Sequence, residues 1–201
     1  MKIQVVIFDL GGVLVKLEPR RMLDKLVKAT GQSVDALQQL LVEPSLLEPF
    51  ELGRISARQY FHRVTQRVRL TWTFQEFAEA WNSVLSENLE TVGLLPRLKE
   101  QYALSVLTNT NELHDEHIRH SWPVFRHVHH WIASYRVGLR KPDPEIFHVA
   151  LRQVQATPDV SVFIDDTKGH VEAAQRMGLT ALQFTDAPTL EQDLRAVGLH
   201  I

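Results

Sequence analysis

The chain has 201 residues, a net charge of −2 with mixed signs, and no cysteine. This length allows one large domain or a domain with an insertion, and the balanced charge argues against a nucleic-acid partner. The lack of cysteine excludes disulfides, a thiolate nucleophile and Cys-based zinc sites. The longest apolar runs are too short for a bilayer and the N-terminus has no signal-peptide pattern, so we expect a cytoplasmic protein with no membrane partner.

The first predicted element is a strand at residues 3–8, which ends directly before Asp9. Its β-branched and aromatic residues hardly alternate with polar ones, which favours a strand of a parallel sheet that is covered on both faces. In such sheets the functional groups lie at the carboxyl ends of the strands. Gly11 and Gly12 follow at once and allow a tight turn. Asp9 is therefore the first candidate for a reactive group.

Residues 16–88 are predicted to be helical throughout, with no strand. Ser56–Gln59 and Thr73–Glu76 are capping boxes, and Gly31 can end the first helix. A helical block of about 70 residues is too long to be a simple crossover. We expect a helical cap over the carboxyl edge of the sheet, with aromatic side chains in its core. The alternative is an extra layer packed on one face of the sheet.

Further strands alternate with helices in the rest of the chain. The strands are expected at residues 103–107, 128–134, 160–164 and 180–184. The helices are expected at residues 91–101, 111–120, 144–154, 168–177 and 188–197. This alternation predicts an α/β protein with a parallel sheet and right-handed crossovers. The predicted organisation is a catalytic core of residues 1–15 and 89–201, with the cap at residues 16–88.

Reactive side chains follow the later strands as well. These motifs are Thr108-Asn109-Thr110-Asn111, the loop from Gly138 to Pro144 that contains Lys141, and Asp165-Asp166. Asn111 can be a helix cap and Lys141 an ordinary solvated lysine. Asp165 and Asp166 are harder to explain in this way, because adjacent carboxylates after a buried strand repel each other unless a cation is near. Together with Asp9, the motifs indicate one site.

The strings FDLGGVLV, LTNTN, GLRKPDPEIF and FIDD resemble motifs of the haloacid dehalogenase superfamily of aspartate-nucleophile hydrolases. The similarity is to the branch with bacterial sugar-1-phosphate phosphatases and the N-terminal phosphatase domain of soluble epoxide hydrolases. It runs from Met1 to about Thr185, and ELGRIS at residues 51–56 is similar to a stretch of that branch's cap. The resemblance implies a Rossmann-like three-layer α/β/α core, a parallel sheet of order 5-4-1-2-3, and an inserted α-helical cap.

The resemblance also implies a phosphatase that needs Mg²⁺ and acts on a small phosphorylated metabolite, with sugar phosphates among the candidates. Asp9 would attack phosphorus to give an aspartyl-phosphate, which water then hydrolyses. Asp9, the main-chain carbonyl of Gly11 and Asp165 would hold the metal, and Asp166 would orient or neutralise the site. Oxygen ligands of this kind suit Mg²⁺, which often binds one or two carboxylates together with substrate phosphate.

The remaining site residues are expected to handle the phosphoryl group. Lys141 would offset the charge of Asp9 and hold the transferring group. Thr108 and Asn109, a hydroxyl with nearby amide donors, would bind the phosphate oxygens.

Gly11 departs from the family pattern. Most phosphatases of this superfamily carry an aspartate there, two residues after the nucleophile, as acid for the leaving group and base for water. Positioned acid–base catalysis is typically worth a factor of about 10²–10⁴. We therefore expect a preference for substrates whose leaving group departs easily, such as anomeric, acyl or aryl phosphates.

Histidines offer a weaker set of candidates. Many relatives have Asn at the position of His170, and we expect a surface or supporting role for this side chain rather than catalysis. Histidines at positions 114–130 could suggest a zinc site, but solvated polar side chains are the default interpretation.

Two other functions remain open from the sequence. In a 2-haloacid dehalogenase the same aspartate displaces halide from carbon without a metal, and the pair Asp165-Asp166 argues against this reaction. A non-catalytic phosphate- or partner-binding module would have no evident need for Asp9, Lys141 and Asp165. The substrate's identity and the oligomeric state are not determined by the sequence.

Overall fold

The first predicted strand lies in the middle of a five-stranded sheet in the computed structural model, which describes residues 2–201. The strand order is β5-β4-β1-β6-β7, and all neighbouring strands are parallel. The strands are β1 (Val5–Phe8), β4 (Ala103–Thr108), β5 (His130–Ala133), β6 (Ser161–Asp165) and β7 (Thr180–Gln183). This order is the predicted 5-4-1-2-3 arrangement, so the fold class is confirmed.

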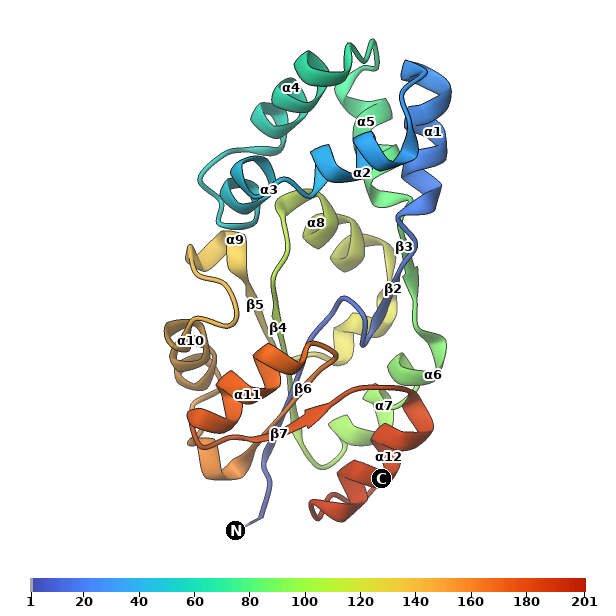
Figure 1. Cartoon of the computed structure of the whole chain (residues 1–201). Helices are drawn as coiled ribbons and strands as arrows, with labels where there is room; N and C mark the ends of the chain where they lie inside the picture. Colours follow the sequence, from blue (N-terminus) through green and yellow to red (C-terminus); the bar gives the residue numbers. More distant parts are fainter. Residues whose placement is uncertain (1) are drawn as a thin grey trace.

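Helices cover both faces of this sheet (Figure 1). They are α6 (Leu89–Val92), α7 (Leu95–Lys99), α8 (Glu112–Ser121), α9 (Ser134–Val137), α10 (Pro144–Val154), α11 (Lys168–Arg176) and α12 (Ala187–Ala196), with short 3₁₀ turns at Pro123–His127 and Pro158–Val160. Val6 and Phe8 of β1 share an apolar cluster with side chains of α7 and α12. Val5 and Ile7 share another with α10 and α11. The alternation of side chains along β1 thus buries the strand on both faces.

A second group of helices lies beyond the carboxyl ends of the strands (Figure 1). These cap helices are α1 (Arg20–Thr30), α2 (Val34–Leu41), α3 (Pro44–Glu51), α4 (Ala57–Val68) and α5 (Phe74–Asn82). Their buried side chains form one cluster. In it the rings of Phe50 and Tyr60 stack with centroids 4.5 Å apart, and those of Phe77 and Trp81 stack at 5.8 Å. The predicted aromatic core of the helical block is confirmed.

Local sequence signals set the ends of several cap helices. Both predicted capping boxes are present, because Ser56 and Gln59 exchange side-chain and backbone hydrogen bonds at the start of α4, as do Thr73 and Glu76 at the start of α5. Gly31 follows α1 with a φ of 70°, where its amide bonds back to the helix. These signals act within one turn of helix, so they can be recognised from the sequence alone.

The expectation that residues 16–88 hold no strand is wrong at both ends of this block. Strand β2 (Val15–Leu17) pairs antiparallel with β3 (Leu85–Glu87), and the ribbon joins the sheet-containing part to the cap helices (Figure 1). Three residues are too few for a recognisable alternation, and the partners lie far apart in the chain. We propose that the boundary between a core of residues 1–15 and 89–201 and a cap of residues 16–88 runs through this ribbon.

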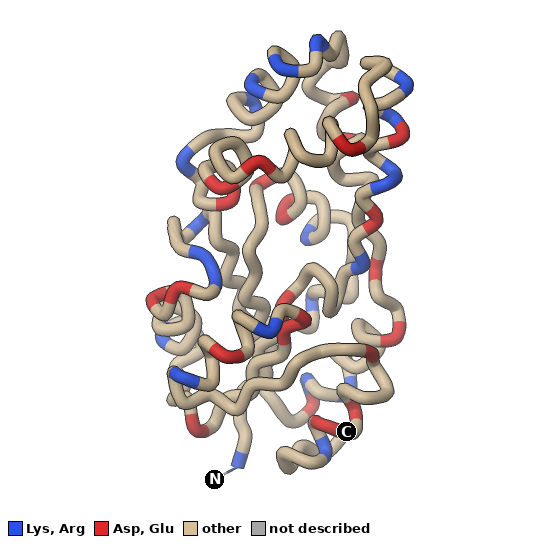
Figure 2. The backbone as a smooth tube through the Cα atoms, in the orientation of Figure 1, with Lys and Arg blue, Asp and Glu red and all other residues tan. Residues whose placement is uncertain are grey.

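Charged residues are spread over both parts of the molecule. Figure 2 shows Lys and Arg interspersed with Asp and Glu along the cap helices and around the sheet. The whole chain has a net charge of −2. Both of its parts carry positive and negative side chains side by side. Within residues 2–201, no helix is both long enough and apolar enough to cross a membrane.

Candidate active site

Asp9 and Asp165 meet at the carboxyl edge of the sheet because their strands are neighbours. Phe8 pairs with Ile164 in the parallel register of β1 and β6, and the amide of Asp9 donates to the Ile164 carbonyl at 2.7 Å. Asp9 follows Phe8 and Asp165 follows Ile164, so the two aspartates lie at the same level of the sheet. Both side chains are buried, with Asp9 7% and Asp165 0% exposed. Two carboxylates are thus placed together where water has little access.

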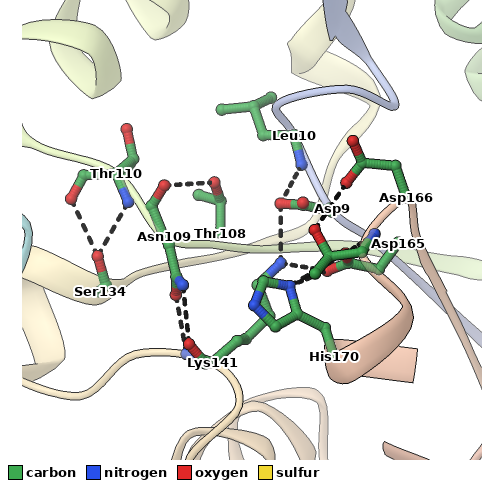
Figure 3. Close-up of polar contacts among 11 residues, drawn as sticks. Asp9, Leu10, Thr108, Asn109, Thr110, Ser134, Lys141, Asp165, Asp166 and His170 are labelled. Atoms are coloured by element: carbon green, nitrogen blue, oxygen red, sulfur yellow. Dashed lines mark hydrogen bonds and ion pairs between the residues drawn. The ribbon is translucent and has the colours of Figure 1, made fainter. Parts of the chain in front are cut away.

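Lys141 lies between these two carboxylates (Figure 3). Its Nζ is 2.9 Å from Oδ1 of Asp9 and 2.5 Å from Oδ2 of Asp165. The side chain is 1% exposed and its ammonium lies 5.5 Å from the ring centroid of Phe163. Lys141 is therefore not a solvated lysine. Its charge compensates a pair of carboxylates that would otherwise be buried without a partner.

Asn109 fixes the backbone of Lys141. The Nδ2 of Asn109 donates to the Lys141 carbonyl at 2.9 Å, and the Lys141 amide donates to Oδ1 of Asn109 at 2.8 Å (Figure 3). This pair of bonds joins the loop after β4 to the loop that carries the lysine. Both side-chain atoms of Asn109 thus hold the backbone of Lys141, and its main-chain amide is a further donor that could reach a phosphate.

The loop after β4 also carries a free hydroxyl and a helix cap. Thr108 is 2% exposed, and its hydroxyl has only a 3.5 Å contact with the Asn109 carbonyl. The side chain of Asn111 accepts from the His114 amide at 3.2 Å and begins α8, as predicted. The hydroxyl of Thr108 is thus free to turn toward a bound anion.

Ser134 is a residue of this site that the sequence did not suggest. Its buried Oγ accepts a hydrogen bond from the Thr110 amide at 2.9 Å and lies 2.6 Å from the Glu51 carbonyl of α3. The hydroxyl therefore ties the loop after β4 to the cap helices. No motif contains Ser134, and only the fold brings it to this position.

The two carboxylates differ in their pKa. Burial raises the pKa of Asp9 to about 6, an effect that Lys141 opposes and Asp165 reinforces. Burial also acts to raise the pKa of Asp165, but a hydrogen bond from His170 and the charge of Lys141 hold that pKa below its usual range. Environments that move the pKa values of two neighbouring carboxyl groups in opposite directions are typical of catalytic sites. At neutral pH both groups are anionic, and Asp9 is the less stabilised anion.

Three side chains at this edge could share a metal ion. Asp9, Asp165 and His170 each offer a ligand atom, and these atoms lie within 4.8 Å of one another. Nδ1 of His170 is 3.1 Å from both carboxylate oxygens of Asp165. This contact gives His170 the supporting position expected for it, beside a metal-ligand candidate. A pair of buried carboxylates suits a hard cation such as Mg²⁺.

The turn after β1 leaves a main-chain oxygen available to the same ion. The amides of residues 13–15 all donate to the carbonyl of Leu10. Among residues 2–201, no hydrogen bond uses the carbonyl of Gly11. This carbonyl is the third metal ligand expected from the family resemblance, and it has no competing partner here.

Gly12 lets Asp166 approach this turn. Its φ is +80°, and a Cβ at this position would lie 2.0 Å from Oδ2 of Asp166. A side chain at position 12 would therefore collide with that carboxylate as well as strain the backbone. Asp166 is exposed and lies beside the buried cluster, which is compatible with the orienting or neutralising role expected for it.

His114 differs from the solvated histidine expected in this stretch. Its ring stacks on Trp81 of α5 with centroids 5.2 Å apart, and Nε2 lies 3.2 Å from the Trp81 carbonyl. Burial lowers the pKa of His114 to about 4. The default interpretation is therefore wrong for His114, because α8 packs against the cap helices.

A cavity of about 260 Å³ lies between the cap helices and the sheet edge. Leu10, Gly11, Thr108 and Asn109 line its inner end. It therefore opens onto the loops that hold the candidate nucleophile and the candidate phosphate-binding residues.

Comparison with known proteins settles the family. The family model of haloacid dehalogenase-like hydrolases matches residues 3–178. The chain belongs to this family. The assignment made from the four motifs is thus confirmed, and with it the expectation of an enzyme of the hydrolase class.

Similar proteins cover almost the whole chain. D-ribitol-5-phosphate phosphatase of Bacteroides thetaiotaomicron is 22% identical in an alignment of 202 positions that covers 97% of this chain and 98% of that protein. Sesquiterpene phosphatase astK of Aspergillus oryzae is 28% identical in an alignment of 198 positions that covers 94% of this chain and 93% of that protein. Both are phosphatases by name, and both match the cap as well as the core.

Solved structures agree with this fold. The structure of a HAD family enzyme of B. thetaiotaomicron in complex with magnesium and inorganic phosphate has a TM-score of 0.82 at 26% identity and covers 91% of this chain and 94% of that chain. The L-2-haloacid dehalogenase of Xanthobacter autotrophicus has a TM-score of 0.67 at 16% identity, covering 99% of this chain and 85% of that chain. The latter likeness concerns the fold alone.

Proposed function

We propose that this protein is a magnesium-dependent phosphatase of a small phosphorylated metabolite and that it works through an aspartyl-phosphate on Asp9. The observation that carries the proposal is the buried contact of Lys141 with both Asp9 and Asp165 at the edge of the sheet. The phosphatase names of two relatives and the magnesium and phosphate bound to a solved relative support it.

Asp9, Asp165 and the main-chain carbonyl of Gly11 would hold Mg²⁺. When bound, the ion supplies positive charge that offsets the repulsion between an anionic nucleophile and an anionic ester. His170 would keep Asp165 oriented through its contact at 3.1 Å. The cluster contains more carboxylates than cationic side chains, which favours a divalent cation there.

The reaction begins with a carboxylate oxygen of Asp9 attacking phosphorus. The ester P–O bond breaks, the alcohol leaves with its electron pair, and the phosphoryl group is now bonded to Asp9. Lys141, the hydroxyl of Thr108 and the amide of Asn109 would neutralise and orient the phosphoryl oxygens. Water then attacks phosphorus, releasing inorganic phosphate and restoring the Asp9 carboxylate.

Gly11 offers no acid to protonate the departing alcohol. The leaving group must therefore depart as an alkoxide or take a proton from water, and this favours alcohols of low pKa. The two relatives named above act on a sugar-alcohol phosphate and a sesquiterpene phosphate by name. Sugar phosphates thus stay among the candidate substrates. Because the two relatives act on different classes of ester, their names do not identify the organic group of this protein's substrate.

The direct test is turnover of phenyl phosphate with Mg²⁺ by the wild type and by Asp9→Asn. We expect turnover by the wild type, loss of at least a thousandfold in the variant because the nucleophile is gone, and loss in EDTA. Asp35→Asn, at an exposed position of α2, is the matched control and should keep the wild-type rate.

Other outcomes would favour the alternative functions. Halide released from a 2-haloacid in EDTA would indicate a dehalogenase. No turnover of phenyl phosphate or of a broad panel of phosphorylated metabolites would favour a binding module. Either result would overturn the proposed function.

A further inference from the structure

The cavity above the candidate site is lined mainly by apolar side chains. Its walls include Leu17 of β2, Met22 of α1, Leu41 of α2, Trp81 of α5 and Leu85 of β3. These residues come from the cap helices and from the ribbon that joins them to the sheet. The surface that faces the site from the cap is therefore hydrocarbon over most of its area.

This apolar surface begins directly at the nucleophile loop. Gly11 and Leu10 line the same cavity as Thr108 and Asn109. Cδ1 of Leu17 lies 3.3 Å from the position that a Cβ of Gly11 would take. In the place where an acidic side chain would project from position 11, the protein thus has a leucine, so the leaving group of a bound phosphate ester meets an apolar wall.

Asn111 and His114, two polar side chains of the cavity wall, already have partners within the protein, whereas Oε2 of Glu51 is buried without a hydrogen bond in the described part of the chain. Oδ1 of Asn111 accepts from Nε1 of Trp81 and from the His114 amide, each at 3.2 Å. His114 contacts the Trp81 carbonyl, and the carboxylate of Glu51 lies 3.3 Å from Arg140. Hydroxyl groups of a polyol would find few free partners here, and a buried polar group without a hydrogen bond is costly.

The exposed residues of the cavity wall, which form its rim, are mostly apolar, with Gln38 as a polar one among them. Leu17 and Val42 are 52% and 57% exposed and both line the cavity. Leu89, 72% exposed, is a comparable residue outside the cavity wall. Exposed apolar side chains that gather around a cavity mark a surface that a ligand covers.

We propose that the substrate is a monophosphate whose organic group is mainly hydrocarbon, an alkyl or aryl group rather than a polyol. This inference rests on the proposed phosphatase function. The phosphate would bind at the sheet edge, and the hydrocarbon would extend along Leu17 toward the cap helices. With a volume of about 260 Å³, the cavity holds a group well beyond a methyl ester.

The test is a series of phenyl phosphates with para-alkyl groups of increasing length. Para-alkyl groups hardly alter the pKa of the phenol, so the chemistry of the leaving group is constant while the apolar area grows. We expect kcat/KM with Mg²⁺ to rise by up to about fourfold per methylene until the cavity is full. Ribitol 5-phosphate and glucose 1-phosphate should be poorer substrates than the longer members of the series.

Variants at the exposed rim separate binding from folding. Leu17→Ser and Val42→Ser should flatten the rise with chain length, mainly through KM, and both variants should keep the fold because these side chains are exposed. Leu89→Ser changes an equally apolar, exposed side chain outside the cavity and should retain the full rise.

Two outcomes would overturn this inference. One is a flat or falling kcat/KM along the series, while the turnover of phenyl phosphate still depends on Asp9 and on Mg²⁺. The other is a higher kcat/KM for the polyol phosphates than for the alkylphenyl phosphates. No turnover of any compound would instead overturn the proposed phosphatase function. Calorimetry with alkylphosphonates of increasing length would still decide about the cavity, because equal affinities along that series would contradict hydrocarbon binding.

Discussion

Asp9 illustrates, at the scale of single residues, how the candidate site is made at the expense of stability. An anionic side chain that is 7% exposed loses most of its hydration, and Lys141 restores only part of that loss. This is the reason that burial raises the pKa of Asp9 to about 6. Poor solvation of this kind would make Asp9 reactive in the nucleophilic role proposed for it.

Asp9→Asn should therefore stabilise the metal-free protein at neutral pH. A carboxyl group whose pKa is raised on folding lowers stability once it ionises, so the penalty grows as pH rises from about 4 to about 6 and then stays constant. A rise from 3.8 to about 6 corresponds to about 3 kcal/mol at 1.36 kcal/mol per pKa unit. Urea unfolding in EDTA at pH 5 and pH 7.5 measures this effect, which should be larger at pH 7.5.

Lys141→Met serves as the opposite case in the same experiment. It leaves two buried carboxylates without their counter-charge and should lower the free energy of unfolding by about 3–5 kcal/mol. An Asp9→Asn protein that is less stable than the wild type at pH 7.5 would contradict the description of Asp9 as a destabilising buried anion.

At the scale of helices and strands, the cap is organised by interactions within one turn. The capping box at the start of α4 (Ala57–Val68) has Ser56 accepting from the Gln59 amide at 3.3 Å and Gln59 accepting from the Ser56 amide at 2.8 Å. Such bonds satisfy amides that the helix itself leaves free. They act within one turn, and the amide of Ala57 also donates to the carboxylate of Glu112 at the start of α8.

Ser56→Ala should lower the free energy of unfolding by about 1 kcal/mol, because the amide of Gln59 loses its acceptor. Arg63→Ala, at an exposed position in the middle of the same helix, is the matched control and should be neutral or slightly stabilising, since alanine favours helix interiors. Urea unfolding of both variants measures the difference. Equal stabilities of the two variants would show that the box does not hold the start of α4.

The sequence predicts elements whose causes are local and misses those whose causes are distant. The capping boxes, Gly31 at the end of α1 and the apolar run of β1 depend on neighbouring residues, and each is present. The β2–β3 ribbon depends on a pairing between Val15 and Glu87, which no local pattern announces. The same holds for Ser134, which reaches the loop after β4 only through the fold.

The candidate site shows the same division. Asp9, Lys141 and Asp165 could be predicted because each ends a strand or follows one within a recognisable motif. The bonds of the Asn109 side chain to the backbone of Lys141, and the stacking of His114 on Trp81, required the loops and helices to be placed in space.

At the scale of the whole molecule, the sheet edge supplies charge and the cap supplies an apolar wall. The cavity between them brings together side chains from β2, α1, α2 and α5 with the loops after β1 and β4. A phosphate at the inner end and an organic group beneath the cap would each face surfaces suited to them. The proposed function thus divides chemistry and selectivity between two parts of one chain.

The most direct test of this account is to trap the covalent intermediate. The protein is mixed with an aryl phosphate and Mg²⁺, quenched in acid within a single turnover, digested and examined by mass spectrometry. We predict a phosphoryl group on the peptide that contains Asp9, and none when Mg²⁺ is replaced by EDTA. A phosphoryl group on any other residue, or undiminished turnover by Asp9→Asn, would contradict the account.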